Sequence, residues 1–138
     1  MLQHRCRAAL TVALLMIAGT APAAEYASYS GQQLYQRFCA ACHGAEAHGD
    51  GPVSKYLSVE VPDLRFLARR NHGVFPAERL QRIVDGRATV GAHGTRTMPV
   101  WGEEFTRSEI GDPEAERYTG MIIARIVDYL RTLQLAPQ

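Results

Sequence analysis

The amino-acid sequence predicts a small all-α protein with one domain. Its 138 residues are a common length for a single domain. No stretch shows the alternation of apolar and polar residues that is typical of a strand, and no internal repeat is present. In the C-terminal part, apolar side chains instead recur at helical spacing, at Tyr118, Ile122, Ile126, Tyr129 and Leu133.

The first 23 residues are predicted to be a signal peptide. Arg5 and Arg7 precede an almost entirely apolar run over residues 8–18, and Ala21-Pro22-Ala23 is a small-x-small cleavage site. The apolar run is short for a membrane span, and an uncleaved anchor is the alternative interpretation. We therefore expect cleavage near Ala23, a mature domain over residues 24–138, and no stable membrane span after cleavage.

The first helix of the mature domain is expected to follow Ser30. Ser30 and Gln33 have the spacing of a capping box, in which each side chain bonds a backbone amide at the other position. The helix would continue through residue 43 and stop at Gly44, since glycine favours helix C-termini. Residues 24–29 are expected to form a short, poorly structured lead.

Three further helical segments are expected. Asp63 is a candidate N-cap for a short helix that ends near Arg70. Pro76 suits the first position of the next helix, which ends at Gly86. The buried stripe of that helix is expected to comprise Leu80, Ile83 and Val84. A long connection over residues 87–105 precedes the last helix, which begins at Asp112-Pro113 with aspartate as N-cap.

Residues 39–43 read Cys-Ala-Ala-Cys-His, the C-x-x-C-H pattern by which a c-type haem is attached. On a helix, positions i, i+3 and i+4 share one face, so both thiols of Cys39 and Cys42 can reach the haem edge while His43 reaches the iron. A structural zinc site needs four ligands, and no second Cys/His pair follows. A thioredoxin-like dithiol needs a βαβ setting, which this sequence lacks.

The cysteine count agrees with the haem motif, and the charge argues against nucleic-acid binding. After cleavage only Cys39 and Cys42 remain, so haem attachment leaves no cysteine for a disulfide. An exported domain of this size without disulfides needs another source of cohesion, which a buried porphyrin supplies. The mature chain has 13 basic and 14 acidic residues, a formal charge of −1. No concentrated basic face indicates nucleic-acid binding. The loop at residues 44–53 is either a plain surface turn or a segment that folds back beside the haem.

One histidine leaves the second axial position of the iron open. The candidates are Met98, Met121, His48, His72 and His93. Met121 is interpreted as a core residue, and His48 and His72 as solvated loop residues. Met98 is preferred, because its thioether is a soft neutral ligand and Pro99 restricts it to extended backbone. His93, in a glycine-flanked stretch, is the rival.

Taken together, the mature chain resembles a class I cytochrome c of bacterial type. Four elements between Gly31 and Leu133 carry the resemblance. They are Gly31 and Tyr35 with the motif at 39–43, Gly49-Asp50-Gly51-Pro52, Met98-Pro99-Val100-Trp101-Gly102, and Ile126-Val127-Asp128-Tyr129-Leu130 in the last helix. The resemblance implies a small class I cytochrome c fold, in which crossed N- and C-terminal helices surround one covalently attached haem c.

The resemblance also implies roles for single residues. It implies thioether bonds from Cys39 and Cys42, and axial ligation of the iron by His43 and Met98. Pro52 matches the family proline whose carbonyl accepts a hydrogen bond from the ligating histidine, a bond that fixes the imidazole's orientation. Gly31 would permit the close approach of the two helices at Tyr129. Candidates for contacts with the haem propionates are Arg87, Arg96 and Trp101.

The implied function is single-electron transfer in the periplasm, by a free carrier or by the haem subunit of a redox complex, and not an enzymatic reaction of the chain itself. Its partners would be other redox proteins, such as a dehydrogenase or a terminal oxidase or reductase. The competing interpretation is a haem enzyme or small-ligand sensor with a labile sixth ligand. An arginine-rich segment over residues 65–87 and an acidic one over 103–116 are either two solvated faces or a dipole that orients the protein on a partner.

Overall fold

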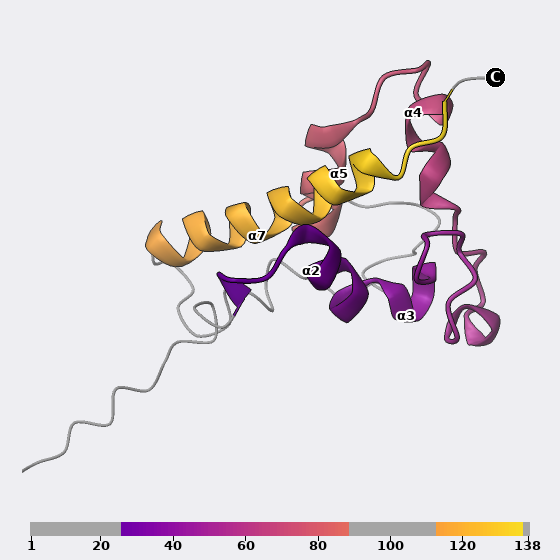
Figure 1. Ribbon diagram of the computed structural model, residues 1–138, viewed down its shortest axis with the longest axis horizontal. Coiled ribbons are helices and arrows are strands. Elements are labelled where there is room, and N and C mark those ends of the chain that lie inside the picture. Colours follow the sequence, from indigo (N-terminus) through magenta and orange to yellow (C-terminus); the bar gives the residue numbers. More distant parts are fainter. Residues whose placement is uncertain (1–25, 89–112, 137–138) are drawn as a thin grey trace, which may run out of the picture.

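The computed structural model describes residues 26–88 and 113–136, which form helices joined by turns and loops and contain no strand (Figure 1). The elements are, in chain order, α2 (Gly31–Phe38), α3 (Ala40–His43), the short 3₁₀ turns η1 (Ser54–Tyr56) and η2 (Leu64–Phe66), α4 (Leu67–Arg70), α5 (Ala77–Val84) and α7 (Pro113–Thr132). The all-α prediction is confirmed.

The helices α2 and α7 cross in close contact, which confirms the expected crossing of the first and last helices. A Cβ atom built on Gly31 would lie 2.1 Å from the carbonyl oxygen of Arg125 and 3.0 Å from Cβ of Tyr129. Only glycine permits this approach of the two backbones. The Arg125 guanidinium then donates to the carbonyl oxygen of Ala27 at 2.6 Å, which fastens the chain entering α2 to α7.

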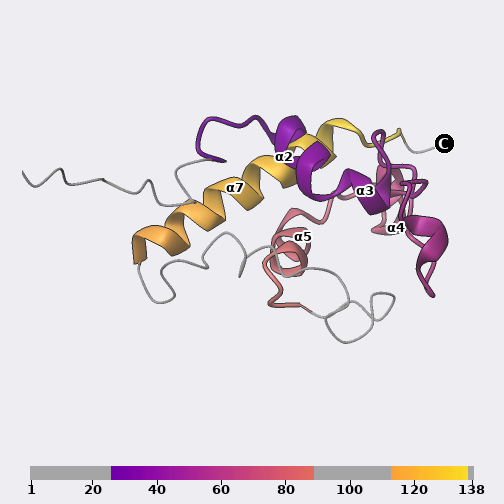
Figure 2. The same cartoon turned by 90° about the horizontal axis from the view of Figure 1, so that it is seen from below.

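The core lies where α7 is covered by α2 on one side and by α5 on the other (Figure 2). Burial of these apolar side chains is the main favourable contribution to folding. The buried residues are Leu34 and Tyr35 of α2, Leu80 and Val84 of α5, Ile122, Ile123, Ile126, Val127 and Leu130 of α7, and Ala47.

Several expected helix ends are confirmed. Ser30 and Gln33 form the complete capping box. The side chain of Asp63 accepts a hydrogen bond from the Arg65 amide, as a cap does, although the segment begins as the 3₁₀ turn η2 before it becomes α4. Pro113 is the first residue of α7. Pro76 lies one position earlier than expected, at the N-cap of α5.

Two interpretations are corrected by the structure. Met121 is 39% exposed and is not a core residue, because the inward face of α7 is formed by the flanking positions 119, 122, 123 and 126. Residues 26–29 are not an unstructured lead. They form a turn, closed by the Tyr29 amide on the Tyr26 carbonyl, and the Tyr26 ring packs edge-on against Phe38 at 5.2 Å between centroids.

None of the helices in the described part of the chain combines the length and the hydropathy needed to cross a bilayer. The predicted signal peptide, residues 1–23, lies outside the described residues.

Candidate functional site

The C-x-x-C-H motif forms one helical turn at the end of α2. Cys39 ends α2 and caps α3, with φ −117° and ψ −35°. The amides of Cys42 and His43 both donate to the Cys39 carbonyl, at 3.2 and 2.9 Å. Cys39 and His43 are therefore one turn apart on the same face, as the predicted geometry requires. His43 is buried, whereas the residues Cys39 and Cys42 are partly exposed and form no disulfide.

The loop after the motif folds back onto the motif turn, and this confirms that the loop is more than a plain surface turn. The amides of Gly49, Gly51 and Val53 donate to the carbonyls of His43, Cys42 and Ala41, at 2.8, 3.1 and 2.9 Å. The last carbonyls of a helix have no partner within the helix, so these three bonds complete the C-terminus of α3. Pro52 lies between two of the donors and is thereby held beside the motif.

Gly51 is the point of closest approach between this loop and the motif. A Cβ atom at Gly51 would lie 2.5 Å from the Ala41 carbonyl oxygen and 2.6 Å from that of Ala40. Both atoms belong to the backbone of the motif helix, so no side-chain rotation relieves such a contact. The absence of a side chain at Gly51 therefore permits the three hydrogen bonds.

We expect Gly51→Ala to destabilise the loop by about 1–3 kcal/mol, the usual cost of overpacking a close contact. The added methyl group would push Pro52 away from the motif turn. Thermal unfolding of the haem-loaded variant would measure the loss. Gly73→Ala is the matched control for packing, because nothing lies within 4 Å of a Cβ atom there, although its φ of +84° adds backbone strain of its own. An unfolding midpoint for Gly51→Ala at or above that of the wild type would contradict the close contact.

Tyr35 supports the motif from the core. Its ring is fully buried, and its hydroxyl donates to the carbonyl of Gly44 at 2.7 Å. Burial, together with the neighbouring Cys39, raises the pKa of this hydroxyl well above its usual value, so that it remains a hydrogen-bond donor. Gly44 has φ +83°, which ends α3 and turns the chain into the loop. The resemblance included Tyr35, but its bond to Gly44 was not predicted.

The two cysteines of the motif are free, as covalent attachment of a haem requires. Burial raises the pKa of the Cys39 thiol to about 12, with a further contribution from Cys42, so the sulfur is uncharged at neutral pH. Among the described residues, no group of three or more His, Cys, Asp or Glu side chains is arranged to hold a metal ion.

An apolar segment next to the motif also fits the large apolar surface of a porphyrin. Seven large apolar side chains of the described residues are exposed, and four of them lie between residues 53 and 59. They are Val53, Tyr56, Leu57 and Val59, of which Tyr56 is the most exposed at 77%. The Val53 amide bonds the motif carbonyl of Ala41, so this segment begins against the motif itself. Exposed apolar side chains that gather in one place indicate a binding surface.

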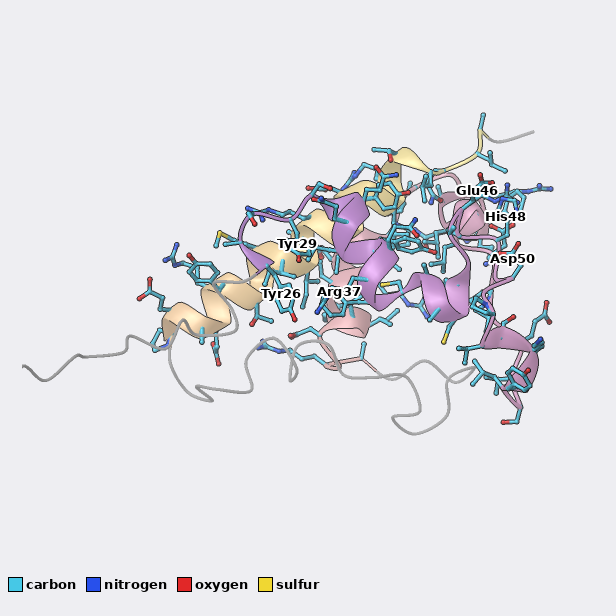
Figure 3. All side chains as sticks on the ribbon, turned by 60° about the horizontal axis from the view of Figure 1, so that its bottom comes forward. Tyr26, Tyr29, Arg37, Glu46, His48 and Asp50 are labelled. Carbon is cyan, nitrogen blue, oxygen red and sulfur yellow. The ribbon has the colours of Figure 1, made fainter. Side chains whose placement is uncertain are left out.

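The other predicted ligands divide into two groups. Met98 and His93, as well as Arg96 and Trp101, lie outside the described residues. His48 and His72 are exposed, as expected. His48 lies near two carboxylates of the motif loop, 3.5 Å from Glu46 and 4.0 Å from Asp50 (Figure 3). The Arg87 guanidinium forms an ion pair with Asp85, so a carboxylate of the chain already occupies this candidate for a propionate contact.

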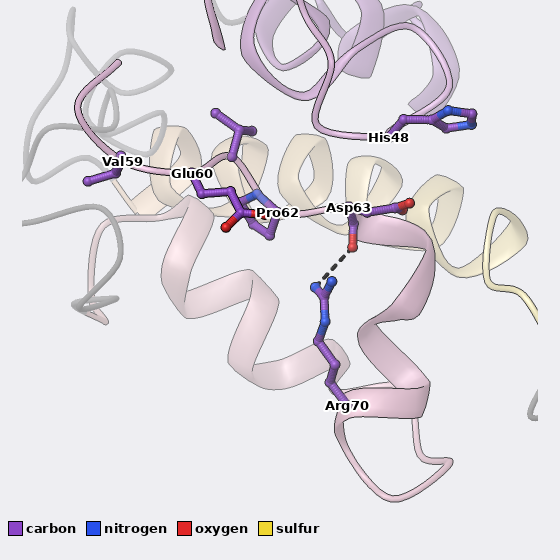
Figure 4. A pocket seen from close by; sticks show the side chains of 7 residues that line it. His48, Val59, Glu60, Pro62, Asp63 and Arg70 are labelled. Atoms are coloured by element: carbon purple, nitrogen blue, oxygen red, sulfur yellow. Dashed lines mark hydrogen bonds between the residues drawn. The ribbon is translucent and has the colours of Figure 1, made fainter. Parts of the chain in front are cut away.

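A surface groove of about 550 Å³ adjoins the motif loop (Figure 4). His48 and Glu60 line it, and the guanidinium of Arg70 extends across it to donate to the main-chain oxygen of Asp63 at 3.0 Å. The Asp63 carboxylate is bound in turn by Arg65 at 2.6 Å, which holds the pKa of Asp63 below its usual value. The carboxylate of Asp63 and the guanidinium of Arg70 are therefore engaged within the chain, where they stabilise the segment that leads into α4.

Comparison with known proteins adds the family. The chain matches the family model described as "Cytochrome C oxidase, cbb3-type, subunit III" over residues 27–112, which is more than half of its length. No individual curated protein and no solved structure matches it. The matched range contains the whole C-x-x-C-H motif and the returning loop. Members of this family carry a covalently attached haem c, in agreement with the free thiols and the buried imidazole. The chain therefore belongs to the cbb3-type subunit III family of class I c-type cytochrome domains, and haem c is its cofactor.

Proposed function

We propose that the chain transfers single electrons in the periplasm through one haem c with histidine and methionine as axial ligands. The motif turn is the observation that carries this proposal. It holds the Cys39 thiol and the His43 imidazole one turn apart, with the Cys42 thiol between them in sequence. In the proposal, Cys39 and Cys42 form the thioether bonds, His43 is one axial ligand and Met98 is the other.

The haem, when bound, supplies a one-electron ferric/ferrous couple. The chain's own residues hold that group and restrict access to it. The three backbone bonds from Gly49, Gly51 and Val53 fix the turn that carries His43, and the Tyr35 hydroxyl fixes its end at Gly44. Pro52 is proposed to orient the His43 imidazole through its carbonyl, as the family proline does. A rigid ligand set with both axial positions filled favours electron transfer over substrate binding.

We further propose that the partner is another redox protein and that the chain is one subunit of a redox complex. The matching family is named as a subunit of a terminal oxidase, which supports this arrangement. A periplasmic location is supported by the charged start, the apolar run and the Ala-Pro-Ala site within residues 1–23. Attachment of haem through two cysteines, without a disulfide, is also compatible with an exported chain.

Replacement of Met98 tests the electron-transfer proposal against the enzyme or sensor alternative. We expect Met98→Ala to lower the reduction potential, because the lost thioether favours ferrous iron. A tenfold loss of that preference corresponds to about 59 mV for one electron. The variant should also bind carbon monoxide readily, and the wild type should not. Voltammetry and carbon monoxide titration measure both effects.

Met121→Leu is the matched control, since Met121 is an exposed methionine of α7. It should retain the wild-type potential and exclude carbon monoxide. If Met98→Ala behaves as the wild type does, Met98 is not the ligand, and His93→Ala becomes the next variant to measure. Rapid carbon monoxide binding by the wild type would instead favour the haem enzyme or sensor.

A further inference from the structure

Three arginine side chains lie around the short helix α4 and the C-terminal end of α7 without a carboxylate partner among the described residues. They are Arg69, Arg70 and Arg131. The Arg69 guanidinium lies over the ring of Phe66 at 5.7 Å, and that of Arg131 lies over Phe75 at 4.9 Å. Arg70 donates to a main-chain oxygen rather than to an acid. We call this group, with the two phenylalanines, the arginine ledge.

Hydrogen bonds tie the two halves of the ledge together, although they are far apart in sequence. The Gln134 side chain accepts from the Ala68 amide and donates to the Leu64 carbonyl, both at 2.9 Å. The Leu135 amide donates to the Arg65 carbonyl at 3.0 Å. The end of α7 is thereby fixed against α4, and Arg131 is held near the segment that carries Arg69.

The positive charge of the ledge is local. Asp63, at the N-cap of η2 just before α4, is bound by Arg65 and neutralises that arginine. Within residues 26–88 and 113–136, Arg69, Arg70 and Arg131 have no such acidic partner, whereas the predicted mature chain has a formal net charge of only −1. A concentrated charge on a nearly neutral molecule orients the molecule toward a complementary surface.

The ledge also has the composition of a protein interface. Arginine is among the residues enriched at binding hot spots, and an aromatic ring beneath a guanidinium restricts its motion before binding. Two of the exposed apolar side chains lie at the same place, Val74 at 65% and Leu135 at 42% exposure. Val74 precedes Phe75 directly, and Leu135 is bonded to Arg65.

We propose that the arginine ledge binds an acidic surface of a partner protein and holds the domain there. This inference rests on the proposed function, since it names the chemistry of the partner in the redox complex. Figure 1 places α4 and the C-terminal end of α7 above α3, which carries the motif. The ledge is thus a holding contact that is separate from the motif through which the haem is attached.

An acidic protein fits the ledge better than an anionic membrane does. The guanidiniums are spread over two elements and are fixed by rings and by a main-chain oxygen, which suits carboxylates at defined positions. Membrane-surface binding instead uses a continuous amphipathic helix with a basic face, and α4 has only four residues.

The test measures binding of the haem-loaded protein to immobilised poly-L-glutamate at low and at high NaCl. The ledge variant Arg69→Glu/Arg131→Glu should bind at least about tenfold more weakly than the wild type at low salt. The control Lys55→Glu/Arg117→Glu reverses two exposed charges outside the ledge and changes the net charge equally. It should lose clearly less binding than the ledge variant, because it changes the net charge by the same amount but leaves the ledge intact. High salt should weaken the wild type toward the ledge variant.

The second arm measures binding to vesicles of phosphatidylglycerol and phosphatidylcholine. The ledge and control variants should bind these vesicles equally. Equal loss of poly-L-glutamate binding in the ledge and control variants would overturn the proposal, as would a ledge-dependent loss confined to the vesicles. Arg69→Gln/Arg131→Gln removes the two charges without reversing them, so it tests the ledge even if the charge reversal disturbs folding. It should also bind poly-L-glutamate more weakly than the wild type. Reduction of each protein by ascorbate, followed by absorption, reports separately on the haem. If the wild type is reduced normally but its binding to poly-L-glutamate does not depend on the ledge, only the ledge proposal is overturned and the proposed electron transfer is unaffected.

Discussion

Replacing both Cys39 and Cys42 by alanine should abolish covalent attachment of the haem, and each single replacement should weaken it. The two sulfurs are the only cysteine thiols within the matched family range, and the motif turn presents them from one short helix. Extraction with acid and acetone removes haem that is held only by coordination, so absorption of the extracted protein measures the covalent fraction. We expect none in the double variant.

Cys6→Ala is the matched control, because Cys6 lies in the predicted signal peptide. It should retain its haem fully through the same extraction. Haem that remains on the double variant after extraction would show that another side chain forms the covalent bond. Complete retention by both single variants would show that one thioether bond is enough, and it would leave the second without a role in attachment.

Gly31→Val should destabilise the folded protein by about 3 kcal/mol or more, at the upper end of the usual cost of overpacking. The Cβ atom would lie 2.1 Å from the backbone oxygen of Arg125, so relief requires the two helices to separate. Such a separation would uncover Leu34 and Tyr35, which are fully buried by the crossing. The melting temperature should fall by more than about 10 °C in a domain of this size.

Gly120→Ala provides the comparison within the same fold. Gly120 is in the middle of α7, and nothing lies within 4 Å of a Cβ atom there. Alanine favours the helix by up to about 1 kcal/mol over glycine, so this variant should be slightly more stable than the wild type. A melting temperature of Gly31→Val equal to that of the wild type would refute the close crossing of α2 and α7.

Local signals in the sequence predicted much of this fold. The capping box at Ser30 and the proline at the start of α7 depend only on neighbouring residues, and both are present. Periodicity predicted a buried face of α7 through Ile122 and Ile126, and both are buried. Met121 lies outside that spacing and was misjudged as a core residue, since it is 39% exposed. The C-x-x-C-H spacing likewise predicted one turn, which the backbone bonds on Cys39 confirm.

Other features depend on contacts between residues that are distant in the sequence. The turn at Tyr26 is ordered by Phe38, twelve positions later in the chain, so its polar and small neighbours gave no indication of it. The three bonds from the returning loop to the motif were expected only as one of two possibilities. They depend on the close approach at Gly51, and glycine is common in loops where no second segment comes near. Met98 remains a prediction from its sequence setting and the family resemblance.

The crossing of α2 and α7 has a consequence for the order in which the chain folds. The bond from Arg125 to Ala27 joins residues that are 98 positions apart, whereas the bonds that close the motif loop join residues at most twelve apart. Closing a long loop costs more chain entropy than closing a short one, and its contacts form later. The cysteine turn and its loop can therefore organise as a local unit before α7 arrives. Until α7 packs against α2, Leu34 and Tyr35 are exposed to solvent, and the two cysteine thiols are accessible. We therefore expect α7 to make its contacts with the core last, and covalent attachment of the haem to be easiest before α2 and α7 cross.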